Sequence, residues 1–138
     1  MPKAMTVNFR ASDALESRER KSNENLIYLA SIQERTIREA MDFVASEFIC
    51  YTLPHELKQI GKSDGVYVFC QRKTISDSWT ILYVGKSTNL QNRIQNHIYA
   101  ARFTGEGTRV FCLYQYQNLM YWESMLISLL NPKFNKMR

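Results

Sequence analysis

The chain has 138 residues, of which 45% are hydrophobic, and its formal net charge is +5 at pH 7. That length is typical of one domain with a single hydrophobic core that needs no disulfides. No apolar run approaches the roughly 20 residues of a membrane span, and residues 1–13 lack the apolar segment of a secretion signal. We therefore expect a cytoplasmic protein with no membrane partner.

The positive charge lies in the second part of the chain. Residues 1–52 contain 7 Lys or Arg and 8 Asp or Glu, whereas residues 53–138 contain 11 and 5. A basic segment of this kind favours a polyanionic partner such as nucleic acid. The three cysteines and two histidines have no zinc-ligand spacing, which argues against a structural zinc site.

The first expected element is a long amphipathic helix over residues 23–50, with apolar residues such as Leu26, Ala30, Ile37 and Val44 at helical spacing. All five glycines follow residue 53, so the chain changes character there. We predict an N-terminal helical extension over residues 1–52 and a second domain over residues 53–138. The extension is a candidate for packing on that domain, or for forming a homodimer or larger oligomer.

Short elements follow after Gly65. Residues 65–71 and 79–85 are predicted strands joined by a polar connection, and residues 108–116 form a third strand. Residues 87–102 are predicted as a helix with an apolar stripe. A last helix, residues 119–130, begins at a capping Asn118 and ends at Asn131-Pro132. The predicted fold class is α+β, with a three-stranded, mostly antiparallel sheet flanked by helices.

The tripeptide Gly85-Lys86-Ser87 occurs at the end of phosphate-binding P-loops. A P-loop also requires a glycine five residues earlier, because its backbone amides wrap around the phosphates. Thr80 occupies that position, and residues 81–84 (ILYV) are β-branched and aromatic residues typical of a strand. The P-loop interpretation is therefore excluded.

Glu123 is the one carboxylate after Glu106, and it lies on or beside the apolar face of the predicted last helix. Burying a lone carboxylate is costly unless it is paired or holds a metal ion. A buried ion pair with an arginine explains the position as well as a metal site does.

Arg93 and His97 are one helical turn apart and share a face. Taken singly, a solvated arginine and a boundary histidine explain them. Tyr67 and Tyr83 lie on adjacent predicted strands, where tyrosine is common, and Lys86 follows the second strand. An ammonium group in that position lowers the pKa of a neighbouring phenol.

The order of these residues in the chain resembles the GIY-YIG nuclease family over about residues 53–136. Residues 65–67 (GVY) and 83–85 (YVG) correspond to the two signatures of the family. The segment LYVGKSTNLQNRIQNH is especially similar to the nuclease domain of the bacterial excision-repair incision subunit. The other family positions fall on Lys86, Arg93, His97, Glu123 and Asn135.

The resemblance implies a DNA endonuclease that hydrolyses phosphodiester bonds with one Mg²⁺ or Mn²⁺ ion, held by Glu123 as the sole protein ligand. A single carboxylate suits Mg²⁺, which keeps several waters and binds phosphate readily. Tyr67 would deprotonate the attacking water, after Lys86 lowers the pKa of its phenol, and His97 would assist. Arg93 would hold the scissile phosphate by paired hydrogen bonds.

The resemblance further implies that Tyr83 orients the phosphate or the water and that Asn135 supports the site. The two signature tyrosines are sixteen residues apart, which is longer than is common in the family. The extra length lies in the polar connection, where Arg72 and Lys73 are candidate DNA contacts, as is Arg102 further along the chain. The alternative is a non-catalytic or partner-dependent nucleic-acid-binding subunit of a repair or restriction assembly.

Overall fold

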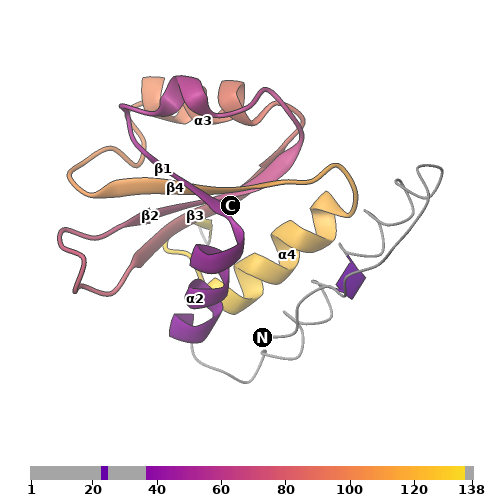
Figure 1. The fold of residues 1–138 in the computed structure, drawn as a ribbon, viewed down its shortest axis with the longest axis horizontal. Helices are drawn as coiled ribbons and strands as arrows, with labels where there is room; N and C mark the ends of the chain where they lie inside the picture. Colours follow the sequence, from indigo (N-terminus) through magenta and orange to yellow (C-terminus); the bar gives the residue numbers. More distant parts are fainter. Residues whose placement is uncertain (1–22, 25–36, 136–138) are drawn as a thin grey trace.

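The computed structural model describes residues 23–24 and 37–135. Its helices and strands are arranged around one sheet (Figure 1). In chain order they are helix α2 (Ile37–Glu47), strand β1 (Ile49–Thr52), the 3-10 helix η2 (Leu57–Gln59), strands β2 (Gly65–Gln71) and β3 (Thr80–Ser87), helix α3 (Leu90–Tyr99), strand β4 (Thr108–Tyr114) and helix α4 (Leu119–Leu130).

The sheet has four strands in the order β1-β4-β2-β3, and each neighbouring pair is antiparallel. The predicted α+β class is confirmed, but the predicted number of three strands is wrong. The fourth strand is β1, which pairs with β4 from Ile49 opposite Cys112 to Thr52 opposite Arg109. Its first two residues fall inside the segment that we predicted as helix.

Helices cover both faces of the sheet. Helices α2 and α4 lie against one face and α3 lies against the other (Figure 1). The central strand β2 is buried along most of its length, and alternate side chains of a strand point to opposite faces. Val66 and Val68 accordingly join the core under α2 and α4, whereas Tyr67 and Phe69 join the core under α3.

The predicted strands and helices after residue 65 are present with small changes at their ends. Helix α4 has the predicted bounds, while α3 is shorter than predicted at both ends. Asn118 precedes α4 as predicted, but it makes no side-chain capping bond and instead donates from its amide to Asn23 Oδ1 over 3.1 Å. Of the long helix predicted over residues 23–50, residues 25–36 lie outside the described part of the chain, and α2 forms its second part.

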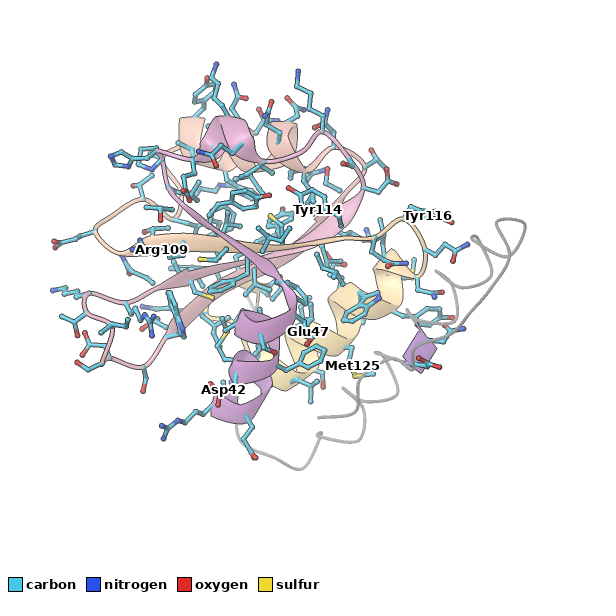
Figure 2. All side chains as sticks on the ribbon, in the orientation of Figure 1. Asp42, Glu47, Arg109, Tyr114, Tyr116 and Met125 are labelled. Carbon is cyan, nitrogen blue, oxygen red and sulfur yellow. The ribbon has the colours of Figure 1, made fainter. Side chains whose placement is uncertain are left out.

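The connection between β1 and β2 is fixed to β4 by tyrosine hydroxyls. The hydroxyls of Tyr51 and Tyr114 lie 2.6 Å apart, and the Tyr114 oxygen also accepts the Gly61 N–H over 2.8 Å. Tyr114 lies at the end of β4 (Figure 2). These bonds anchor residues 53–64, while α2 packs in the core beside α4. The predicted boundary between residues 52 and 53 stays a prediction.

The C-terminal segment covers the open edge of β3. Lys133 and Phe134 donate their backbone N–H groups to the carbonyls of Ile81 and Leu82, over 3.0 and 2.9 Å. An unpaired strand edge exposes donors and acceptors that another chain could pair with. Residues 133–135 therefore protect the edge strand that carries Tyr83 and Lys86.

Candidate functional site

Tyr67 lies at the centre of the candidate site, and Gly85 makes room for it. The two residues are opposite each other in the β2–β3 ladder. A Cβ atom added to Gly85 would collide with the phenol ring and hydroxyl of Tyr67. The glycine of the YVG segment is therefore required by the tyrosine of the GVY segment, whose side chain crosses directly over it.

Helix α3 brings His97 to the Tyr67 hydroxyl. The helix begins after Asn89, whose side chain accepts the Asn92 N–H over 3.1 Å, and a cap of this kind fixes the start of a helix. His97, two turns further on, is buried, and its Nε2 atom lies 2.9 Å from the Tyr67 hydroxyl oxygen. Residues 30 positions apart in the chain thus form one hydrogen-bonded pair.

The ring of Tyr83 completes an aromatic cluster with this pair. Its centroid lies 6.2 Å from that of Tyr67 and 5.2 Å from that of His97. The β2–β3 ladder shifts register beside it, because Phe69 pairs with Tyr83 and the next residue, Cys70, pairs with Ile81. Such a bulge redirects side chains locally, and Tyr83 remains half-buried at the edge of the sheet.

Burial raises the pKa of the Tyr67 phenol well above its ordinary value, and Tyr83 and Glu123 raise it further. Arg93 acts in the opposite direction. We expected Lys86 to lower this pKa, and that expectation is wrong. Lys86 lies opposite Val66 in the ladder, so strand alternation directs it to the α4 face of the sheet, away from the Tyr67 phenol.

Arg93 and Glu123 act on Tyr67 from different elements. Arg93 is exposed on α3, one turn before His97, and Glu123 is half-buried on α4. Both are near enough to affect the pKa of Tyr67 electrostatically. The two charged residues therefore belong to the surroundings of one phenol, although 30 residues separate them in the chain.

His97 is held in its neutral form. Burial lowers the pKa of His97 to about 4, and the positive charges of Arg102 and Arg93 contribute to the same shift. A neutral imidazole carries a proton on one ring nitrogen and accepts one on the other. At neutral pH, His97 can therefore accept a hydrogen bond from the Tyr67 hydroxyl or donate one to it, depending on its tautomer.

A basic, polar cleft opens beside His97. The cleft has a volume of about 410 Å³, and we call it the α3 cleft. Two of the lining side chains, those of Arg93 and Arg102, carry positive charge, and His97 adds a neutral imidazole. The other lining residues are Ser87, Thr88, Asn89, Asn92, Asn96 and Ala100. Guanidinium, amide and hydroxyl donors suit a phosphate group.

The side chain of Asn135 bonds to the backbone of β3. Its Oδ1 accepts the Val84 N–H over 2.7 Å, and its Nδ2 donates to the Val84 carbonyl over 2.9 Å. The side chain is buried. Asn135 therefore fixes β3 between Tyr83 and Gly85, and its role in the site stays a prediction.

The sequence reasoning missed Phe103, which lies in the connection between α3 and β4. Its ring stacks on Tyr83 at a centroid distance of 5.4 Å and an interplanar angle of 23°. Phe103 and Ala101 have positive φ angles of 54° and 57°. Residues other than glycine rarely adopt this backbone conformation. No periodic pattern marks such a loop residue, so its position between Arg102 and Gly105 was the one available signal.

The predicted DNA contacts are divided between two places. Arg102 lines the α3 cleft. Arg72 and Lys73 follow the far end of β2, roughly 16 Å along the strand from Tyr67 at about 3.3 Å per residue. The Arg72 guanidinium lies 4.0 Å from the ring centroid of Trp79, and Nη1 donates to the Ile75 carbonyl, so Arg72 orders the β2–β3 connection.

Among the described residues, Glu123 is the candidate metal ligand, and it does not belong to a group of three or more possible ligands. In residues 23–24 and 37–135, no group of three or more His, Cys, Asp or Glu side chains gathers closely enough to hold a metal ion. A zinc or calcium cage is therefore not formed by these residues. Glu123 alone fits the sparse protein coordination of Mg²⁺, in which water and phosphate oxygens supply the other ligands.

Comparisons of the chain with models of protein families, with curated proteins and with solved structures find no match. Within the described residues, the helices are too short or too polar to cross a membrane.

Proposed function

We propose that the chain is a divalent-metal-dependent DNA endonuclease that hydrolyses phosphodiester bonds and is related to the GIY-YIG nucleases. One observation carries this proposal. Five of the seven residues that the resemblance selects, at positions 67, 83, 93, 97 and 123, come from β2, β3, α3 and α4, and the other four of these affect or contact the Tyr67 phenol. A purely structural tyrosine has no need of both an arginine and a glutamate in its surroundings.

In this proposal the α3 cleft receives the scissile phosphate. Arg93 offers two parallel N–H donors to the phosphate oxygens, and Arg102 adds a second positive charge. The arriving phosphate neutralises the two charges that help to keep the pKa of His97 low. His97 therefore becomes more basic when the substrate is bound.

The Tyr67–His97 pair takes up the proton of the attacking water. The raised pKa of Tyr67 keeps the phenol protonated, so the phenol serves as a relay and not as a preformed phenolate. The phenol oxygen accepts a proton as its own proton passes to the neutral imidazole over the 2.9 Å hydrogen bond. This role for Tyr67 replaces the mechanism in which Lys86 generates a phenolate.

The remaining groups of the site position the reacting atoms. Tyr83 orients the phosphate from the edge of the sheet, and Asn135 holds the strand that carries it. An Mg²⁺ or Mn²⁺ ion bound at Glu123 would offset negative charge on the phosphate and on the leaving oxygen. Water enters the site from the α3 cleft, which His97 lines.

A second candidate function is a nucleic-acid-binding subunit that does not cleave by itself. The complete burial of Tyr67 favours it, because the phenol has 0% exposed surface and no direct access to bulk water. Both functions use the same basic cleft. They differ in whether phosphodiester bonds are broken.

An Arg93→Ala substitution tests the proposal. We expect end-labelled DNA oligonucleotides to be cleaved with Mg²⁺, and the single-turnover rate to fall about 100-fold or more when Arg93 is replaced, because a donor to developing charge is lost. Arg38→Ala, an exposed arginine on α2, is the matched control and should leave the rate unchanged. DNA binding that weakens in the Arg93 variant, with no cleavage by any variant, would support the binding subunit instead.

A further inference from the structure

A second cleft has an aromatic lining. It shares only Tyr83 and Arg102 with the residues of the proposed catalytic site. It has a volume of about 710 Å³, and we call it the aromatic cleft. Pockets of this size, about 300–1,000 Å³, hold small molecules or single groups of larger ligands. The lining residues are Gln71, Leu82, Tyr83, Ala101, Arg102, Phe103, Thr104, Lys133 and Phe134.

Three rings in the cleft form a continuous series. Tyr83 stacks on Phe103 at 5.4 Å, and the Phe103 and Phe134 centroids lie 5.6 Å apart. Phe134 is 41% exposed, although its backbone is fixed by the hydrogen bond to Leu82. A large aromatic side chain on this hydrogen-bonded backbone is available at the surface for stacking on a flat ligand.

Two cationic side chains border these rings. Lys133 is exposed, with its Nζ atom 5.6 Å from the Phe134 ring centroid, and Arg102 is exposed on the opposite connection. Among the described residues, no Asp or Glu side chain lines the cleft. The cleft thus combines flat apolar surfaces with positive charge, which is the combination that proteins use to bind unstacked bases and their phosphates.

We propose that the aromatic cleft binds one unpaired DNA base next to the scissile phosphate. Arg102 lines both this cleft and the α3 cleft, and Tyr83 contacts both Phe103 and His97. Arg102 can therefore hold the phosphate of a nucleotide whose base lies against Phe134. This inference rests on the proposed function for the identity of its ligand, and it specifies the substrate as DNA with an extrahelical or single-stranded nucleotide.

Affinity for three duplexes of the same length tests the inference. One duplex is fully paired, one carries a single bulged nucleotide, and one carries a bulged abasic residue. Fluorescence anisotropy with the full chain, with Ca²⁺ in place of Mg²⁺ to suppress cleavage, gives each Kd. We expect roughly tenfold tighter binding of the bulged nucleotide than of either other duplex, because stacking one base on an aromatic side chain contributes about this factor.

Substitutions at Phe134 separate stacking from a structural role. Phe134→Ala should abolish the preference for the bulged base and leave the affinity for the abasic bulge unchanged, whereas Phe134→Trp should retain the preference. Lys133→Ala should weaken binding of all three duplexes equally, since it removes a phosphate contact. Tyr121→Ala, a 67% exposed aromatic residue on α4, is the control and should change none of them.

Several results would overturn the inference. Equal affinities of the wild-type protein for the three duplexes would do so, as would a Phe134→Ala effect of equal size on the base and abasic bulges. A dimer that Phe134→Ala converts to a monomer in sedimentation would assign the cleft to a second copy of the chain. These are binding measurements, so failure of the proposed hydrolysis is seen separately, as intact DNA under Mg²⁺.

Discussion

Tyr67 and Gly85 show how a single contact can connect two short segments of sequence. The phenol crosses the backbone of β3 at the one position without a side chain and reaches His97 beyond it. The glycine is needed for its lack of a Cβ atom and not for an unusual backbone conformation. The same argument applies to Gly65, where a Cβ atom would collide with the Leu113 carbonyl and with Leu90.

We expect Gly85→Ala to destabilise the protein by about 1–3 kcal/mol, as overpacking of a filled core usually does. Urea unfolding followed by circular dichroism measures this change. In a Tyr67→Ala background the same substitution should cost much less, because its collision partner is gone. Equal costs in both backgrounds would show that the phenol does not occupy the space over Gly85.

His97 makes stability depend on pH. Its pKa is about 4 in the folded protein and about 6.5 when unfolded, so the unfolded chain binds more protons between these values. The contribution of His97 to stability is therefore complete above pH 6.5 and is lost as the pH falls towards 4. The melting temperature should decline over this window in the wild-type protein.

His97→Gln removes this titration and retains a hydrogen-bond partner for Tyr67. We predict that its melting temperature declines less than that of the wild-type protein between pH 6.5 and pH 4, as measured by calorimetry. Parallel curves for the two proteins would contradict a low pKa for His97. Carboxylates titrate in both proteins and cancel in the comparison.

Among the elements, β3 carries Tyr83 and Gly85 and depends on the C-terminal segment for its outer edge. The Asn135 amide replaces the missing neighbouring strand at Val84, and the backbone of residues 133 and 134 does the same at Ile81 and Leu82. The segment that ends the described chain is therefore part of the sheet edge. Tyr83 is positioned by these bonds.

Asn135→Ala should cost about 1–3 kcal/mol, because it leaves the buried Val84 N–H without its acceptor. Hydrogen exchange should also be faster at the Val84 amide than in the wild-type protein. Ser124→Ala, on the exposed side of α4, provides the control and should change neither quantity. Unchanged protection of Val84 in the Asn135 variant would show that the edge is held by other groups.

The elements also show what sequence patterns could and could not predict. Strands β2 and β4 and helix α4 have strong alternation or apolar spacing and were predicted. Strand β1 was missed because its first two residues fall inside the segment predicted as helix, and its partner, β4, lies more than 50 residues away. Periodicity cannot reveal a pairing of that kind.

The candidate site, like the fold, was predicted in part. The resemblance selected residues that the fold gathers around Tyr67. It did not predict the direction of the pKa shift of Tyr67, because that shift depends on burial, nor the place of Lys86 on the other face of the sheet. Phe103 and Phe134, which form the aromatic cleft, lie in segments without any periodic pattern.

At the scale of the whole molecule, the basic residues of the α3 cleft and the aromatic cleft lie on the side of the sheet that carries α3. Residues 53–138, which carry the net positive charge, also contain all the residues that line the two clefts. A polyanion is therefore attracted to the region that holds Tyr67 and His97. Glu123 lies on α4, which packs against the opposite face of the sheet, and its charge is what a divalent cation would require.

The most direct test of the account is cleavage of supercoiled plasmid by the wild-type protein and by Glu123→Gln, each with Mg²⁺ or Mn²⁺ and with EDTA. Asp42→Asn removes an exposed carboxylate from α2 (Figure 2) and is the matched control. We predict nicked or linear plasmid with the wild-type and Asp42→Asn proteins, and none with Glu123→Gln or with EDTA. Equal cleavage by wild-type and Glu123→Gln proteins, or intact plasmid in every reaction, would contradict metal-dependent hydrolysis at Glu123.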